Sequence, residues 1–262
     1  MCGRFALTSL PTDVMEYLGL MEVDPFPPRF NIAPTQPILV VKGDRSGEPG
    51  TNRPTRRAQL ARWGLIPGWV KDPKEFPLLI NARAETAAEK PSFRGSMRHH
   101  RILIPASGFY EWHRPSKESG QKSQAYWIRP RDGGLVAFAG LMQPYGSADG
   151  SEIDTAAILT TGANRYVSKI HDRIPVVIRP PDFERWLDCL TQEPRDVADL
   201  LAAIDDDYFE AIPVSDLVNK VKNTTPDIQA PTGDALPLDE TETKSSQSTD
   251  DDARPAGQMS LF

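Results

Sequence analysis

The first residues of the chain, Met1-Cys2-Gly3-Arg4, could carry out nucleophilic chemistry. If the initiator Met1 is removed, Cys2 carries a free α-amino group and a thiol on adjacent carbons. These groups have reference pKa values of about 8 and about 8.5, so both can act as nucleophiles near neutral pH. Such an aminothiol condenses with an aldehyde through its nitrogen, and its sulfur then closes a thiazolidine ring. The alternative is a Cys2 without a chemical role.

Two polar residues directly follow the apolar run at 78–80. Asn81 could cap a following helix, or it could hold the N-terminal amine or thiol in one orientation. Arg83 faces the same side as Asn81 if the segment is extended. A phosphate is its natural partner, and a surface carboxylate is the alternative.

Acid–base groups occur in two further segments. Glu111 lies between aromatic residues of an expected strand, where desolvation suits acid–base chemistry, unless the residue faces solvent at an edge. Its neighbour Trp112 is either part of the core or a stacking platform for an unpaired base. His171, followed by Asp172 and Arg173, is a candidate proton shuttle, although most single histidines are structural. The run at 29–34 predicts only a rigid turn.

Several site classes have no counterpart in the sequence. It contains no Walker loop, dinucleotide glycine fingerprint, Gly-x-Ser-x-Gly elbow or His/Cys metal cluster, so we expect neither a metal nor a cofactor. No apolar run approaches the roughly 20 residues that a membrane span needs, and no signal peptide pattern is present. Cys2 and Cys189 are the only cysteines, which favours a reducing cytoplasm.

Charge is distributed unevenly along the 262 residues, whose net charge is −6. Residues 224–262 contain eight acidic and two basic residues, so residues 1–223 are formally neutral. Within them, residues 53–131 contain 16 basic and six acidic residues. This local excess of positive charge favours a polyanionic partner.

The elements that must position these residues are mostly short strands. Alternating or apolar runs predict strands at 37–42, 59–67, 101–104, 108–113, 125–129, 135–141, 153–160 and 208–214. Helical segments are expected at 8–20, from 86 towards 97, and at 164–170, 182–190 and 196–203. This pattern predicts a single α+β domain with curved, mainly antiparallel sheets over residues 1–223. Residues 224–262 are poor in aromatic residues and are expected to form a disordered acidic tail.

The runs MCGRF (1–5), RFNIAP (29–34), WGLIP (63–67), NARAET (81–86), GFYEW (108–112) and HDRIP (171–175) together resemble the SRAP family, the SOS-response-associated peptidase-like proteins that process abasic sites. The resemblance covers residues 2 to about 223. It implies that mature Cys2 captures the ring-opened aldehyde of an abasic site in single-stranded DNA as a thiazolidine DNA–protein crosslink, which shields the lesion. The peptidase label fits only self-removal of Met1, and a monomer is expected.

The family resemblance also implies roles for individual residues of this chain. The resemblance implies that Asn81 positions Cys2, that Glu111 moves protons, and that His171 assists opening of the sugar ring. The residues expected to contact DNA are Arg4, Arg83, Trp112, Thr160 and Arg173. Trp112 would wedge against the neighbouring base.

The last five residues, QMSLF (258–262), resemble the peptide with which bacterial repair proteins dock on the sliding clamp. Gln258, Leu261 and Phe262 would be its anchors, carried by a flexible linker. A chance apolar terminus is the alternative.

Two other functions remain open. The first is an N-terminal-nucleophile hydrolase or glutamine amidotransferase, since such enzymes can also begin with Met-Cys-Gly; a glutaminase assay distinguishes it. The second is a non-covalent single-stranded DNA-binding module, whose binding would survive replacement of Cys2 by alanine and would be lost in denaturant.

Overall fold

The computed structural model describes residues 2–43, 55–116, 118, 120, 122–147 and 149–238. The strands of this part are β1 (Phe5–Leu7), β2 (Arg29–Ile32), β3 (Pro37–Gly43), β4 (Arg56–Trp63), β5 (Asn81–Arg83), β6 (Arg101–Ala106), β7 (Gly108–His113), β8 (Gln124–Pro130), β9 (Val136–Gly146), β10 (Glu152–Gly162), β11 (Arg173–Pro175), β12 (Val177–Ile178) and β13 (Phe209–Val214). The α-helices are α1 (Pro11–Leu18), α2 (Ala84–Ala87), α3 (Arg94–His99), α4 (Arg165–Ser168) and α5 (Phe183–Leu187). Short 3-10 helices are η2 (Pro180–Asp182), η3 (Pro194–Leu201), η4 (Asp216–Asn219) and η5 (Pro226–Gln229).

The strands form two sheets. One has the order β13-β8-β7-β1-β2 and is antiparallel throughout. The other runs β11-β10-β4-β3-β6-β9-β12, and an additional β10–β9 pairing closes β10, β4, β3, β6 and β9 into a barrel. Only β4 and β5 pair with β10 in parallel among the described strands. The predicted α+β class with mainly antiparallel sheets is confirmed.

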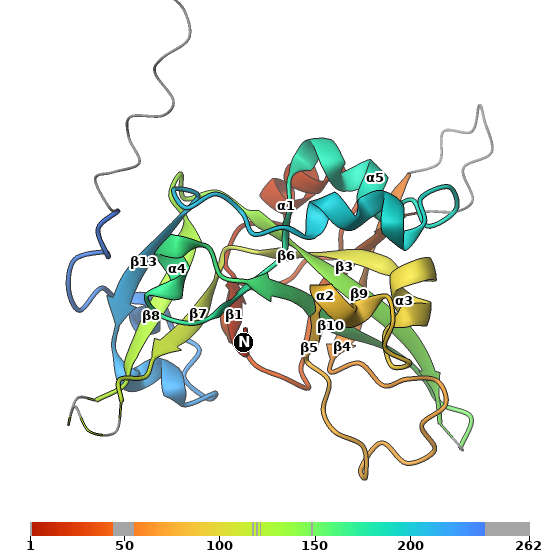
Figure 1. Cartoon of the computed structure of the whole chain (residues 1–262), viewed down its shortest axis with the longest axis horizontal. Helices are drawn as coiled ribbons and strands as arrows, with labels where there is room; N and C mark the ends of the chain where they lie inside the picture. The colour runs from red at the N-terminus through yellow and green to blue at the C-terminus, as the bar shows by residue number, and fades with distance from the viewer. Residues whose placement is uncertain are drawn as a thin grey trace, which may run out of the picture.

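One hydrophobic core joins the two sheets. The ring of Phe5 in β1 lies 5.1 Å from the ring of Trp63 in the barrel and 6.4 Å from that of Phe138, both edge-to-face. Phe109 of β7 also contacts Phe138, at 5.9 Å. Such contacts stabilise the packing beyond the area that they bury. As a result, β1 of the first sheet packs against the barrel near the centre of the molecule (Figure 1).

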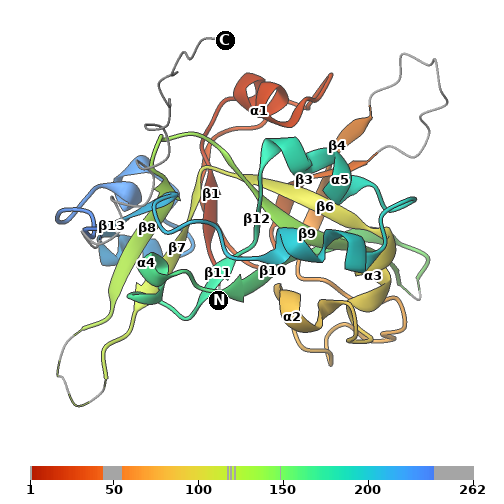
Figure 2. The same cartoon turned by 45° about the horizontal axis from the view of Figure 1, so that its top comes forward.

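The helices are short and lie around the sheets (Figure 2). Helix α1 begins with Pro11 and ends before Gly19, which adopts the left-handed conformation at φ 62° that favours glycine. The N-cap is Leu10, whose backbone N–H donates to Asp13. The expected extent of 8–20 was therefore too long.

Residues 224–238, which the sequence assigned to the acidic tail, pack against the domain. Pro231 forms a β-bridge with Val214, and Ile228 is fully buried. The backbone N–H of Leu236 donates to the carbonyl oxygen of Ala211 at 2.9 Å. The apolar side chains of this segment are widely spaced among polar residues and show no helical or strand periodicity. Its local sequence therefore did not predict the packing.

No helix in the described residues combines the length and the apolar character that crossing a bilayer requires.

Candidate functional site

Strand β1 places Cys2 beside β7. Phe5 lies opposite Phe109, and the backbone N–H of Tyr110 donates to the carbonyl oxygen of Arg4 at 2.9 Å. Cys2 precedes β1 and is fully buried. Its Sγ lies 3.8 Å from the carbonyl oxygen of Arg4, the acceptor of a weak thiol hydrogen bond. The nucleophile is therefore held inside the protein.

The surroundings of Cys2 favour a protonated thiol. Burial raises the pKa of the Cys2 thiol well above its usual range, and the negative charge of Glu111 raises it further. Glu111 itself is only 3% exposed in β7. A Cβ at Gly108, where β7 begins, would lie 2.4 Å from the carbonyl oxygen of Ile128, so this close approach of β7 to β8 requires glycine. The buried carboxylate of Glu111 thus lies close enough to Cys2 to influence its thiol electrostatically.

Asn81 reaches Cys2 from the second sheet. It lies in β5, opposite Ile158 of β10. Its Nδ2 donates a hydrogen bond of 2.9 Å to the carbonyl oxygen of Cys2. Its buried Oδ1 accepts no hydrogen bond from the described part of the chain. Asn81 is therefore not a helix cap; the residue at the N-cap of α2 is Arg83.

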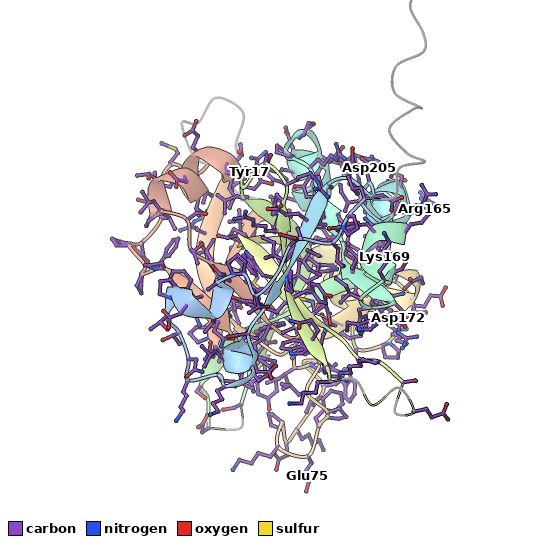
Figure 3. All side chains as sticks on the ribbon, turned by 90° about the vertical axis from the view of Figure 1, so that its left-hand side faces the viewer. Tyr17, Glu75, Arg165, Lys169, Asp172 and Asp205 are labelled. Carbon is purple, nitrogen blue, oxygen red and sulfur yellow. The ribbon has the colours of Figure 1, made fainter. Side chains whose placement is uncertain are left out.

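His171 lies just before β11. Its Nδ1 accepts a hydrogen bond of 3.0 Å from the backbone N–H of Arg173, so the neutral ring carries its proton on Nε2. Asp172 Oδ1 lies 2.9 Å from the same nitrogen, a contact that is attractive only when the ring is charged. The Asp172 side chain is 86% exposed and lies at the edge of the molecule (Figure 3).

Arg173 is held by Glu85 of helix α2 and by Thr160 of the neighbouring strand β10. Its two terminal nitrogens donate to the two carboxylate oxygens of Glu85 at 2.6 and 2.8 Å. Its Nη2 also donates to the carbonyl oxygen of Thr160, at 2.5 Å. The Thr160 side chain is fully buried, and its Oγ1 lies 3.5 Å from both Ala82 O and Arg173 Nη2. Thr160 thus helps to hold the Arg173 guanidinium in place.

Two other expected DNA contacts also have partners within the chain. Arg4 donates to Asn31 Oδ1 at 2.7 Å and to the carbonyl oxygen of Val218 at 2.9 Å. Trp112 is half-buried, and its Nε1 donates to Asn219 Oδ1 at 2.8 Å. Both side chains are therefore oriented by η4. By contrast, Arg83 is exposed.

The structure brings together residues from distant parts of the chain. Asn81 contacts Cys2 directly, and Glu111 acts on the Cys2 thiol electrostatically. His171 accepts a hydrogen bond from the backbone of Arg173. The Arg173 side chain in turn donates to Thr160 of β10, the strand that pairs with β5. The anchors of the C-terminal peptide, Gln258, Leu261 and Phe262, lie outside the described residues.

Sequence reasoning missed several residues around the site. Asn31, in the run expected to form only a turn, is buried in β2 and donates to the carbonyl oxygens of Lys220 and Asn223 at 3.2 and 2.8 Å. Trp69 is 60% exposed beside Phe76, an unusual position for so large an apolar ring. The high exposure of Trp69 could not be read from the sequence, and the carbonyl groups of Lys220 and Asn223 lie 189 and 192 residues from Asn31.

Among the described residues, no group of three or more His, Cys, Asp or Glu side chains is arranged to hold a metal ion.

Comparison with known proteins identifies relatives of the chain. The model of the SOS response associated peptidase (SRAP) family matches residues 1–221. The abasic site processing protein YoqW of Bacillus subtilis (strain 168) is 38% identical over 231 residues, which cover 87% of this chain and 98% of that protein. The abasic site processing protein YedK of Escherichia coli (strain K12) is 31% identical over 236 residues, covering 85% of this chain and 96% of YedK.

The fold also matches a solved crystal structure. That of a protein from Bacteroides thetaiotaomicron superposes with a TM-score of 0.76 at 22% identity, over 88% of this chain and 99% of the other. At this identity the match shows the fold alone.

Proposed function

The chain belongs to the SOS response associated peptidase (SRAP) family, and we propose that it processes abasic sites in single-stranded DNA by crosslinking to them through Cys2. The relatives named above are abasic site processing proteins. The observation that carries the proposal is the hydrogen bond from Asn81 to Cys2 next to the buried carboxylate of Glu111. This arrangement holds an N-terminal aminothiol beside an acid–base group.

The proposed reaction begins with removal of Met1, which frees the α-amino group of Cys2. The neutral amine attacks the aldehyde carbon of the ring-opened sugar, and the carbinolamine loses water to give an imine. The Cys2 sulfur then bonds to the imine carbon, its proton leaves, and the imine nitrogen gains a proton. The product is a thiazolidine, and its formation from the aminothiol and the aldehyde releases one water, whereas the earlier hydrolysis of the Met1–Cys2 bond consumes one and releases methionine.

Asn81, Glu111 and His171 each have a separate role in the proposed reaction. Asn81 fixes the Cys2 carbonyl and so limits the directions in which the amine and thiol can point. Glu111 accepts the thiol proton and returns protons to the departing water. His171, with its proton on Nε2, donates to the sugar oxygen as the ring opens.

DNA contacts complete the proposal. Arg83 and Arg173 bind phosphates beside the lesion, and Arg4 contacts the strand next to Cys2. Trp112 stacks on the neighbouring base in the orientation that Asn219 gives it. Thr160 acts indirectly, by holding Arg173.

Incubating the purified protein with uracil-excised single-stranded DNA tests this function. We expect a band that survives denaturant for the wild type, and none for Cys2→Ala or for DNA without excision. Intact mass should show that the active protein lacks Met1. Binding that survives Cys2→Ala and is lost in denaturant would indicate a DNA-binding module instead, and glutaminase activity would indicate an amidotransferase.

A second part of the proposal concerns the C-terminal peptide. We propose that Gln258, Leu261 and Phe262 dock the protein on the bacterial sliding clamp and so deliver it to replication forks. Deleting residues 258–262 should abolish pull-down by the purified clamp without changing crosslinking in solution. Undiminished pull-down would refute clamp docking and leave the crosslinking proposal intact.

A further inference from the structure

The carboxylate of Glu85 occupies the outer edge of the Arg173 guanidinium. Both oxygens accept hydrogen bonds from the two terminal nitrogens, at 2.6 and 2.8 Å. The Arg173 side chain is 13% exposed and that of Glu85 is 49% exposed. The arginine therefore lies inside the protein surface, and the carboxylate closes it off from solvent.

Arg83 acts on the same carboxylate. The hydrogen bonds from Arg173 lower the pKa of Glu85, and the positive charge of Arg83 contributes in the same direction. Arg83 precedes α2 in β5, two residues before Glu85, and is exposed. Glu85 is thus an anion in the combined field of two arginines. Arg83 lies on the same strand as Asn81, and Arg173 follows His171 by two residues.

A phosphodiester would make the same contacts. Arginine binds carboxylates and phosphates with the same pair of parallel N–H donors, and a phosphate placed between two arginines is a common arrangement. We propose that Glu85 occupies the place of a DNA backbone phosphate between Arg83 and Arg173 in the free protein, and that a bound strand displaces it. Glu85 is then a specificity-determining residue, and its role rests on the function proposed above.

The surroundings of Glu85 permit this exchange. Its half-exposed carboxylate can be rehydrated, and a groove of about 880 Å³ lined by Glu85, Ala88 and Thr161 adjoins it. The hydrogen bond of 2.5 Å from Arg173 Nη2 to the carbonyl oxygen of Thr160 does not involve Glu85, so the exchange leaves it in place to hold Arg173. The site therefore presents a preorganised arginine whose charge is neutralised until DNA arrives.

Every DNA strand must displace Glu85 in order to bind, and this requirement lowers the non-covalent affinity for DNA. An intact strand must break the Glu85–Arg173 ion pair without gaining a covalent bond. An abasic strand breaks the same pair, but the crosslink then holds it. Glu85 therefore shortens unproductive binding to undamaged DNA more than it reduces capture of the lesion.

The test is non-covalent binding of Glu85→Gln to a labelled, undamaged single-stranded oligonucleotide, measured by fluorescence anisotropy over a range of salt concentrations. Gln keeps the shape of the side chain but removes its charge. We expect binding about three- to tenfold tighter than wild type, since one charge-assisted interaction no longer competes. The slope of log affinity against log salt should stay close to that of the wild type, because the bound strand places the same number of phosphates on the protein in both cases.

Glu210→Gln is the matched control. Glu210 forms an ion pair of 2.6 Å with Arg129 between β13 and β8, so the variant makes the same change in net charge elsewhere. An equal gain in both variants would show a general charge effect and overturn the inference. Weaker binding by Glu85→Gln would show that Glu85 merely positions Arg173, and would also overturn it.

A double-mutant cycle with Arg173→Gln completes the test. The gain from Glu85→Gln should disappear in the Arg173→Gln background, and persistence of the full gain would contradict the exchange. Crosslinking by the wild type is measured in parallel. If wild type crosslinks abasic DNA but Glu85→Gln binds no more tightly, only the inference fails; if wild type neither crosslinks nor binds, the proposed function fails with it.

Discussion

The side-chain amide of Asn81 donates a 2.9 Å hydrogen bond to the carbonyl oxygen of Cys2, across the boundary between the two sheets. Asn81 and the proposed nucleophile Cys2 therefore belong to different halves of the fold. Any relative movement of the sheets would change the direction of the Cys2 backbone.

Asn81→Ala should slow crosslink formation. It removes a neutral hydrogen bond with a net value of about 1 kcal/mol, which corresponds to a roughly fivefold lower rate. Single-turnover crosslinking on abasic single-stranded DNA measures the effect. Gln59→Ala is the control, because the side-chain amide of Gln59 donates to Asp154 Oδ2 at 2.6 Å between β4 and β10. This control should lower stability and leave the crosslinking rate of folded protein unchanged. Equal rates for Asn81→Ala and wild type would refute the positioning role.

Cys2 should be slow to alkylate at neutral pH, because its raised pKa leaves little thiolate. Peptide mapping after iodoacetamide treatment should show Cys2 modified more slowly than the half-buried Cys189. Glu111→Gln removes the neighbouring negative charge and should speed the modification of Cys2 alone. Modification of Cys2 at the rate of Cys189 would contradict the assigned environment.

The same pKa shift predicts a pH dependence of stability. A raised pKa in the folded state favours the protonated thiol, so this contribution is present below the ordinary thiol pKa of about 8.5 and is lost as the pH rises above it. In urea unfolding, the stability of wild type relative to Cys2→Ser should therefore fall between pH 7 and pH 10. A constant difference would show that the thiol is not desolvated.

Trp112→Ala should weaken binding to undamaged single-stranded DNA by about 1 to 3 kcal/mol, the usual value of one base stacked on an aromatic ring. Trp112→Phe should retain most of the affinity, since stacking remains although the hydrogen bond to Asn219 is lost. Trp127→Phe, at a buried position in β8, is the control and should bind normally once folded. Unchanged affinity in Trp112→Ala would exclude the stacking role.

A chain ending at Asn223 should be less stable than one ending at Leu238. The shorter chain loses the fully buried Ile228 and the hydrogen bond of 3.0 Å from Gln229 to the Tyr110 hydroxyl. Loss of a buried Ile side chain typically costs about 2 to 5 kcal/mol, which lowers the melting temperature by at least about 5 °C. Thermal unfolding of the two chains measures the difference, and equal melting temperatures would show that this segment contributes nothing.

The long strands were predictable because each carries its own periodic signal. The expected strand at 108–113 coincides with β7, and those at 37–42 and 101–104 lie within β3 and β6. The three-residue strands β1 and β5 were not predicted, since so short a segment becomes a strand only through partners far along the chain. These strands place Cys2 and Asn81, so the sequence indicated which residues could react but not how they meet.

The roles of the arginines show the same limit. Arg4 and Arg173 were expected to reach towards phosphates, and the sequence contains no sign of their partners Asn31 and Glu85 within the chain. An arginine and its carboxylate 88 residues apart are recognisable as a pair only in three dimensions.

The central place of β1 has a consequence for synthesis on the ribosome. β1 is the first strand to be made, yet β7, which flanks it, is complete only about a hundred residues later. The nascent β1 therefore lacks one of its two neighbouring strands while β3, β4 and β6 of the barrel emerge. Another enzyme has that interval to remove Met1, whereas self-removal by the folded domain acts after the fold has closed around Cys2.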